Sequence, residues 1–212
     1  MKQSQLRANT GTKKINANST AKHQKRLARK KLFIITGPSA VGKTSIAKLV
    51  LKKTKNLIRS LTFTSREIRK GEKNGQDYHF ISKKEFQKKI RKSDFLEYAN
   101  NYGNFYGTDK KEITNLLKQG KNVLVVIDIK GAISIKKKMA QAIAIFILPE
   151  STKQLEQRFK KRKDTSIKDV KKRLKTAKWE LLKAPKCDYW VINQEKKIEL
   201  AVEEILEIIG NA

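Results

Sequence analysis

The sequence predicts an α/β fold in which a parallel sheet is flanked by helices. Three observations predict it: an apolar run at 32–36 leads into a glycine-rich turn, β-branched apolar runs recur at 122–129 and 142–148, and stretches with helical spacing lie between these runs. Strands that alternate with helices form parallel sheets joined by right-handed crossovers. A chain of 212 residues is long enough to form one domain with its own core.

The elements expected along the chain follow from these patterns. The run at 122–129 suits a strand inside a parallel sheet, because both of its faces are apolar. Ser82 and Glu85 form a capping box at the start of one helix, and Gly120 stands where a helix end is expected. We expect strands at 32–36, 57–63, 78–81, 95–99, 104–106, 122–129, 142–148 and 189–193, and helices at 43–54, 82–91, 109–118, 151–160, 167–183 and 196–209.

The chain is strongly basic, with a formal net charge of +30. A field of this sign attracts nucleotides, nucleic acid and anionic surfaces alike, so the charge favours polyanionic partners without selecting one. Most of the basic residues are lysines spread through every segment. This spread favours a solvated lysine-rich surface, so we expect no specific nucleic-acid partner, with a nucleic-acid binder kept as an alternative.

Residues 1–31 form a separate basic arm. They contain ten Lys or Arg residues, no Asp or Glu, and few apolar residues, so we expect the arm to be disordered. Acid-free leaders also resemble organelle transit peptides, but this one is rich in lysine and its serines are Ser4 and Ser19 alone. Cys187 is the single cysteine, which fits a reducing compartment, and no stretch reaches the ~18 apolar residues that span a membrane. We therefore expect a cytoplasmic protein with no membrane partner, with an organelle as the alternative location.

The turn after the first strand carries a phosphate-binding motif. Gly37, Gly42, Lys43 and Thr44 satisfy the pattern G-x-x-x-x-G-K-[ST], in which backbone N–H groups surround an anion at the start of a helix. The two glycines let the backbone approach phosphate oxygens closely. We expect Lys43 to reach the β- and γ-phosphates of a nucleoside triphosphate and the Thr44 hydroxyl to hold Mg²⁺.

Several other motifs occur in an order that one protein family shares. They are T-S-R-E-I-R-K-G-E at 64–72, N-G-Q-D-Y-H-F at 74–80, F-L-E-Y-A at 95–99, G-N-F-Y-G-T at 103–108, I-D-I-K-G-A at 127–132 and I-F-I-L-P at 145–149. With the phosphate loop they make residues 32–212 resemble a guanylate kinase, the nucleoside monophosphate kinase that moves the γ-phosphate of ATP to GMP. The combination is far more specific than the phosphate loop alone.

The resemblance implies a fold and a set of partners. The fold would be a P-loop NTPase-type parallel sheet flanked by helices, with a small β-rich GMP-binding insert and a helical lid. The core would comprise 32–61, 107–150 and 174–212, the GMP-binding region 62–106, and the lid 151–173. ATP, GMP or dGMP, and Mg²⁺ are the expected partners, and the protein would act as a monomer or a homodimer.

Each substrate has an expected set of residues. The ATP-binding residues implied by the resemblance are Gly37, Pro38, Ser39, Ala40, Val41, Gly42, Lys43 and Thr44. The GMP-binding residues are Thr62, Arg66, Arg69, Tyr78, Glu97, Tyr106, Thr108 and Asp128. Two guanidinium groups suit one phosphate, and a carboxylate can accept hydrogen bonds from both the N1–H and the amine of guanine. Glu97 is therefore the expected reader of the base.

A third set of residues stabilises the transferred phosphoryl group. The resemblance assigns this catalytic role to Lys43, Arg66, Arg158, Arg162 and Arg173. Arg158 and Arg162 are four residues apart, so they share one face of a helix. Phosphoryl transfer depends on positioning and cationic stabilisation, so no general base is expected. Closure of the lid would exclude water until both substrates are bound.

Asp128 is the acid expected near the metal. It ends the apolar run at 122–129, so we expect its side chain at the carboxyl edge of the sheet, where it would act on Mg²⁺ through water together with Thr44. Two positions depart from the family's usual pattern: Val126 stands where an acid is common, and Ala40 stands where glycine is common. We expect Ala40 to have a negative φ.

Two alternative functions fit the same domain. One is a catalytically weak guanylate-kinase-like binding module, and the other is a kinase of another phosphorylated acceptor. The intact Lys43 and Thr44 argue against the first. The base-reading set of Thr62, Glu97 and Thr108 argues against the second.

Overall fold

The computed structural model describes residues 30–101, 103–160 and 167–212. Its main feature is a five-stranded sheet with the strand order β2-β7-β1-β8-β9, in which every pairing is parallel. The strands are β1 (Leu32–Thr36), β2 (Leu57–Arg59), β7 (Asn122–Val126), β8 (Ile143–Pro149) and β9 (Tyr189–Asn193). The predicted parallel α/β fold is confirmed.

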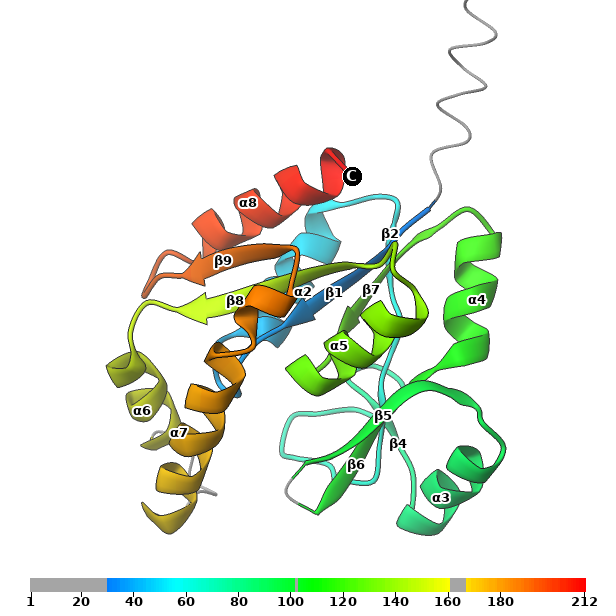
Figure 1. The fold of residues 1–212 in the computed structure, drawn as a ribbon, viewed down its shortest axis with the longest axis horizontal. Helices are drawn as coiled ribbons and strands as arrows, with labels where there is room; N and C mark the ends of the chain where they lie inside the picture. The colour runs from blue at the N-terminus through cyan, green and yellow to red at the C-terminus, as the bar shows by residue number, and fades with distance from the viewer. Residues whose placement is uncertain (1–29, 102, 161–166) are drawn as a thin grey trace, which may run out of the picture.

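Helices cover both faces of this sheet (Figure 1). They are α2 (Lys43–Lys53) and α8 (Ile198–Gly210) on one face, and α4 (Lys110–Lys118) and α5 (Ile129–Lys138) on the other. Side chains of β1 alternate between the two cores. Phe33 and Ile35 pack with the first pair of helices, and Leu32 and Ile34 pack with the second. β1 is therefore the central strand, buried on both faces.

A second, mixed sheet forms a small body beside the main sheet (Figure 1). Its elements are β3 (Phe63–Thr64), β4 (His79–Phe80), β5 (Phe95–Asn101) and β6 (Asn104–Asp109), with α3 (Lys83–Arg91) packed on it. The ring of Phe86 stacks on Phe95 and Phe105, with centroids 4.5 Å and 5.3 Å apart. A Cβ at Gly107 would lie 2.9 Å from the rings of Phe86 and Phe95, so this aromatic core requires the glycine. The β-rich insert expected near 62–106 thus has a core of its own.

Two further helices extend from the main sheet after β8. They are α6 (Thr152–Lys160) and α7 (Ile167–Leu181), which pack against each other at the lower left of Figure 1. The helix α6 lies within the segment expected as the lid, 151–173, and α7 begins in this segment and continues beyond it. Arg162, one of the predicted catalytic residues, lies outside the described residues. A short 3₁₀ turn, η1 (Ala184–Lys186), leads from α7 to β9.

The stretch expected as one strand at 57–63 is divided between the two sheets. The strand β2 ends at Arg59 in the main sheet, and β3 begins at Phe63 in the second sheet. The N–H of Ser60 still bonds to the main sheet, whereas the carbonyl of Thr62 already accepts a hydrogen bond from the second. The chain therefore changes sheets within three residues, which periodicity along the sequence does not reveal.

The strand expected at 122–129 is also shorter than predicted. The strand β7 ends at Val126, and α5 begins at Ile129, because Asp128 caps the first turn of that helix. The apolar character of the run continues across this boundary, since Ile129 is buried at the start of the helix. The other helices and strands end within a few residues of the expected positions.

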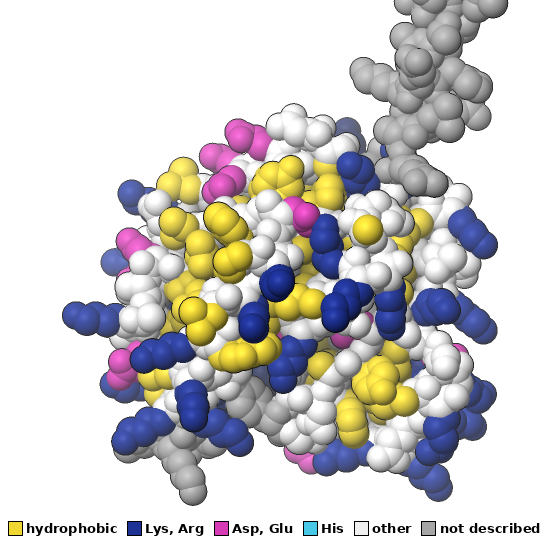
Figure 2. All heavy atoms as spheres, in the orientation of Figure 1, with side chains coloured by type: hydrophobic (Ala, Val, Ile, Leu, Met, Phe, Trp, Pro, Cys, Tyr) yellow, Lys and Arg dark blue, Asp and Glu magenta, His cyan; other side chains and the backbone are white. Residues whose placement is uncertain are grey.

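Lysine and arginine side chains are spread over the whole face of the molecule seen in Figure 2. Acidic side chains on this face gather near α8, whose residues Glu199, Glu203, Glu204 and Glu207 are exposed. The basic residues do not form one stripe on this face, in agreement with a solvated lysine-rich surface. Within the described ranges, no helix is both long and apolar enough to cross a bilayer.

Candidate active site

A large open cavity of about 940 Å³ lies where the main sheet, the second sheet, α6 and α7 meet. Most of the predicted site residues line it. They are Ser39, Ala40, Gly42, Lys43, Thr44, Thr62, Arg66, Arg69, Tyr78, Glu97, Tyr106, Asp128, Arg158 and Arg173. Gly37, Pro38, Val41 and Thr108 are not part of this lining. Pro38 and Val41 adjoin lining residues in the chain, and Gly37 and Thr108 are hydrogen-bonded to Lys43 and Glu97, which line the cavity. The fold thus brings together residues that are far apart in the sequence.

The phosphate loop connects β1 to α2 at one end of this cavity. Gly37 has φ 138° and Gly42 has φ 105°, values that favour glycine. A Cβ at Gly37 would lie 2.5 Å from the carbonyl oxygen of Ile147, and a Cβ at Gly42 would lie 2.5 Å from Nδ2 of Asn193. The two glycines are therefore required both by backbone conformation and by close packing against β8 and β9.

Ala40 has φ 65°, so the expectation of a negative φ is wrong. The left-handed conformation brings Cβ close to the backbone and is unfavourable for an L-residue other than glycine. Contacts at this point help to hold the loop. Nη1 of Arg158 donates hydrogen bonds to the carbonyl oxygens of Ala40 at 3.2 Å and Val41 at 3.0 Å. The side chain of Arg158 thus joins α6 to the phosphate loop.

Lys43 is held against its own loop. Its Nζ donates hydrogen bonds to the carbonyl oxygens of Gly37 at 2.7 Å and Pro38 at 2.9 Å. The ammonium group therefore stands at the loop, where bound phosphate oxygens would compete with these carbonyls for its three N–H donors.

Asn193 was not among the predicted site residues, and it packs against the loop from the end of β9. Its Nδ2 donates to the carbonyl oxygen of Val41 at 2.7 Å, and its backbone carbonyl oxygen accepts from Nε2 of Gln154 at 3.3 Å. The side chain is 3% exposed. In the sequence the only signal for Asn193 is its position at the carboxyl end of the last strand, where ligands of α/β sheets bind.

Glu97 and Thr108 form a buried pair at the other end of the cavity. The two residues are opposite each other in the ladder between β5 and β6. Oγ1 of Thr108 donates to Oε1 of Glu97 at 2.7 Å, and Glu97 is 4% exposed. The pKa of Glu97 is raised to about 7, mainly by burial; the Thr108 hydrogen bond opposes this rise, and the nearby charge of Asp128 adds to it. A carboxylate that is buried with one hydroxyl partner retains free acceptor capacity for a ligand.

Arg66, Tyr78 and Tyr106 gather beside this pair. The guanidinium of Arg66 lies 5.5 Å from the centre of the Tyr78 ring, and the rings of Tyr78 and Tyr106 are 6.2 Å apart. Nη2 of Arg66 is 2.9 Å from both carboxylate oxygens of Glu72, and the backbone N–H of Arg69 donates to the same carboxylate. Glu72, which was not among the predicted residues, therefore balances the charge of Arg66 in this structure.

Asp128 lies at the N-terminus of α5 rather than in a strand, which corrects the expectation that it ends the strand. Its Oδ1 accepts the N–H of Gly131 at 2.8 Å, and its Oδ2 accepts a hydrogen bond from Nδ2 of Asn101. Asn101 was not predicted; its side chain joins the second sheet to α5. Asp128 and Thr44 both line the cavity, so a hydroxyl and a carboxylate are available to a cation there.

A second buried carboxylate, that of Glu180 in α7, was also missed. Glu180 is 9% exposed, lines the cavity, and has the backbone N–H of Ser39 as a hydrogen-bond partner. Burial raises the pKa of Glu180 to about 7, and the charge of Lys43 opposes this rise. In the sequence Glu180 follows Arg173 by seven residues, two helical turns, so both project from one side of α7. This spacing from a predicted site residue was the signal in the sequence that could have identified Glu180 as a residue of the cavity.

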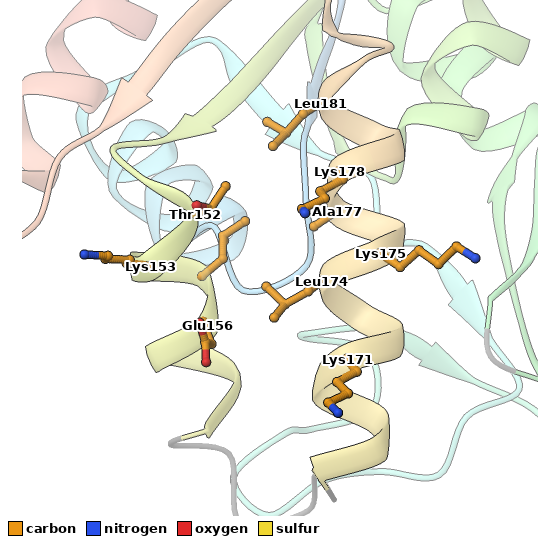
Figure 3. Close-up of a pocket in the computed structure, with 10 residues that line it drawn as sticks. Thr152, Lys153, Glu156, Lys171, Leu174, Lys175, Ala177, Lys178 and Leu181 are labelled. Atoms are coloured by element: carbon orange, nitrogen blue, oxygen red, sulfur yellow. The ribbon is translucent and has the colours of Figure 1, made fainter.

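A smaller groove of about 400 Å³ separates α6 from α7 (Figure 3). Leu174 and Leu181 point into it and Lys175 points away. Among the described residues predicted for the site, none lines this groove. It lies between α6 and α7, across the expected boundary at 173/174 between the lid and the core, and it shares no lining residue with the large cavity.

The comparisons with known proteins agree with this geometry. A family model described as guanylate kinase matches residues 29–212. The chain belongs to the guanylate kinase family. A guanylate kinase from Thermotoga maritima is 41% identical over 178 residues, which cover 84% of this chain and 85% of the relative. A guanylate kinase from Clostridium tetani is 42% identical over 179 residues, with 84% and 85% covered.

A solved guanylate kinase structure supports the same conclusion. The crystal structure of guanylate kinase from Anaplasma phagocytophilum matches with a TM-score of 0.71 and 30% identity, covering 86% of this chain and 85% of that chain. The family and the P-loop type of fold predicted from the motifs are confirmed.

Proposed function

We propose that this member of the guanylate kinase family transfers the γ-phosphoryl group of ATP to GMP, giving ADP and GDP. One observation carries the proposal: a single cavity joins the phosphate loop, with Lys43, to the buried Glu97–Thr108 pair. The loop is suited to a triphosphate and the pair to a guanine base. We propose dGMP as a second acceptor, because the assigned residues bind the base and the phosphate, which GMP and dGMP share.

The donor half of the cavity is the loop at 37–44. Its backbone N–H groups and the start of α2 hold the phosphates of ATP. Lys43 leaves the carbonyl oxygens of Gly37 and Pro38 and bonds to the β- and γ-phosphates. The loss of those two hydrogen bonds is offset by charge-assisted bonds to phosphate.

The acceptor half reads the base and holds the phosphate of GMP. Glu97 accepts from the N1–H and the amine of guanine, with Thr62 and Thr108 as hydroxyl partners. Adenine and pyrimidines lack this pair of donors, and the buried carboxylate would stay unpaired with them. Arg66, Arg69, Tyr78 and Tyr106 bind the GMP phosphate, which displaces or shares the bond between Arg66 and Glu72.

A magnesium ion fits the donor set of this cavity. Mg²⁺ keeps several waters and binds through one or two protein oxygens plus substrate phosphates, and Thr44 and Asp128 supply a hydroxyl and a carboxylate. Thr44 would hold the ion directly and Asp128 through water. When bound, the ion neutralises charge on the β- and γ-phosphates. Val126 stands where family members often have a further acid, so this chain has one carboxylate fewer near the proposed Mg²⁺ site.

The transfer step needs positioning and positive charge. A phosphate oxygen of GMP attacks the γ-phosphorus, the bond from this phosphorus to the bridging oxygen breaks, and ADP leaves with that oxygen. Lys43, Arg66, Arg158 and Arg173 stabilise the charge on the transferred group. We assign the same role to Arg162, which lies outside the described residues. The attacking oxygen is already ionised, so no general base takes part.

We further propose that the lid at 151–173 moves relative to the core at 32–61, 107–150 and 174–212 and to the GMP-binding region at 62–106. Closure brings the arginines of α6 and α7 onto the phosphates and excludes water. We also infer a cytoplasmic location, because the relatives are bacterial guanylate kinases and the one cysteine forms no intrachain disulfide. A monomer or homodimer stays a prediction.

A panel of acceptors tests this proposal. The full chain is incubated with ATP, Mg²⁺ and each of GMP, dGMP, AMP, CMP, UMP and a sugar phosphate, and ADP is measured. We expect ADP with GMP and dGMP alone. Turnover with the sugar phosphate would favour the other phosphorylated acceptor, and no turnover by folded protein that still binds GMP would favour the binding module.

A further inference from the structure

Gly131 occupies a helical position that does not require glycine for its backbone. It lies in the first turn of α5, and its φ is not positive. Glycine is less favourable than alanine inside a helix because it loses more backbone freedom on folding. The helix alone therefore favours a side chain at this position, and a reason for the glycine has to come from its surroundings.

The space beside Gly131 is filled by the carboxylate of Glu97. A Cβ built at position 131 would lie 2.7 Å from Oε2 and 3.0 Å from Cδ of Glu97, and 3.2 Å from Cδ1 of Ile127. Real Cβ atoms do not approach other heavy atoms as closely as the first of these distances. Either the carboxylate or the helix would have to move.

The helix is fixed against β5 on both sides of Glu97. Near its start, Asp128 accepts a hydrogen bond from Asn101 at the end of β5. Near its end, Lys138 donates to the backbone carbonyl of Leu96, the residue before Glu97. These two connections hold α5 in place, so the carboxylate is the part that moves. Moving it would disturb the 2.7 Å bond from Thr108.

We propose that Gly131 is a positioning residue for guanine recognition, because its lack of a side chain leaves the space in which the Glu97 carboxylate is held. This inference rests on the proposed role of Glu97 as the reader of the base. Gly131 acts through Glu97 and does not touch the nucleotide. The residues that determine base selectivity then include Gly131 in the core helix α5 in addition to Glu97 and Thr108 in the second sheet.

The substitution Gly131→Ala tests the inference. The dissociation constant for GMP, measured by calorimetry, should rise by about tenfold or more, because a displacement of about 1 Å costs up to 100-fold at a positioned group. The dissociation constant for ATP should not change, since Gly131 and Glu97 lie outside the phosphate loop that is proposed to bind ATP. Gly210→Ala is the matched control, because a Cβ at Gly210 in α8 meets nothing within 4 Å. It should bind GMP as the parent chain does.

A second background separates this inference from the proposed function. In Glu97→Ala there is no carboxylate to displace, so adding Gly131→Ala should change the GMP dissociation constant by less than about twofold. If Glu97→Ala itself leaves GMP binding unchanged, Glu97 does not read the base. If Glu97→Ala weakens binding but Gly131→Ala does not, or if the two losses multiply, the role given to Gly131 is wrong.

The double variant also covers a failure of folding. Should Gly131→Ala alone fail to fold, recovery of folded protein in the Glu97→Ala background would support the contact between the two residues. Failure in both backgrounds would overturn it, because the side chain would then clash with something other than the carboxylate.

Discussion

The hydroxyl of Thr108 donates to Oε1 of Glu97 at 2.7 Å, across two paired strands of the second sheet. Both residues are nearly inaccessible, with 1% and 4% exposure. A carboxylate in this position is costly unless a ligand supplies further donors. Guanine supplies two, and this is the physical basis of the base selectivity proposed for the chain.

The raised pKa of Glu97 predicts that GMP binding depends on pH. The bound base needs the ionised carboxylate, so the dissociation constant for GMP should fall as the pH rises from about 6 to about 8 through the pKa of about 7. Calorimetry at several pH values measures this. Because the GMP phosphate also titrates near pH 6, Glu97→Gln serves as the control that keeps the phosphate and removes the carboxylate. An identical pH profile in both proteins would contradict the assignment.

The two buried carboxylates, Glu97 and Glu180, also predict how the stability of the nucleotide-free protein depends on pH. The folded chain holds protons on Glu97 and Glu180 up to about pH 7, whereas in the unfolded chain both titrate near the ordinary value of 4.5. The free energy of unfolding contributed by these groups is therefore present at low pH and is lost as the pH rises from 4.5 to about 7. Urea unfolding across this range measures the effect. The double variant Glu97→Gln, Glu180→Gln should lose most of this slope, and an unchanged slope would mean that other groups produce it.

Lys43→Ala should impair the donor half of the cavity and leave GMP binding in the acceptor half unchanged. Loss of the ammonium should lower kcat by at least about 100-fold, because a preorganised charge at the transferred group is removed. GMP should bind as before, since none of the residues assigned to GMP lies in the phosphate loop at 37–44. Quenched assays of ADP formation measure kcat, and calorimetry measures the dissociation constant for GMP. Lys52→Ala, an exposed lysine on the same helix, is the control. An equal loss of GMP affinity in Lys43→Ala would show that the halves are not independent.

Ala40→Gly should stabilise the chain. The φ of 65° is unfavourable for alanine, and glycine relieves this at a smaller cost in the entropy of the unfolded chain. We expect the free energy of unfolding to rise by roughly 0.5–1 kcal/mol. Ala40→Val should lower it, because a branched side chain is worse at positive φ. Urea unfolding of the three proteins measures both changes, and a loss of stability in the glycine variant would contradict the strained conformation.

Removal of residues 1–29 should leave kcat and KM nearly unchanged. The truncated chain keeps Lys31, whose backbone N–H and carbonyl pair with Asn122 and Val123 beside the central strand. Steady-state kinetics at low and high salt measure the effect. A loss of more than about tenfold at both salt concentrations would mean that the basic arm belongs to the site, whereas a loss at low salt alone would reflect electrostatic steering.

Local patterns in the sequence predicted the elements and the motif residues well. The strand, loop and helix at 32–53 follow from apolar runs, glycine spacing and helical periodicity, which act over a few residues. The family motifs added the residues of the acceptor half, such as Glu97 and Arg66, which the fold brings into one cavity with the loop.

The features that the sequence did not reveal depend on contacts between distant segments. Glu72, Glu180 and Asn193 line the cavity, and each forms a hydrogen bond there. No periodic pattern in the sequence links any of the three to its hydrogen-bond partner. The φ of Ala40 is imposed by the loop and its packing, against the residue's own preference. Asp128 became a helix cap because its side chain accepts the N–H of Gly131, a bond that competes with continuing the strand.

Transfer of the terminal phosphate itself tests the central claim most directly. The full chain is incubated with Mg²⁺, GMP and ATP labelled with ³²P at the γ-position, and the labelled products are separated. The two-substrate cavity predicts that the label appears in GDP and that little appears as inorganic phosphate, whether or not AMP is also present. Label released mainly as inorganic phosphate, or label in ADP made from the added AMP at a rate similar to that in GDP, would contradict it.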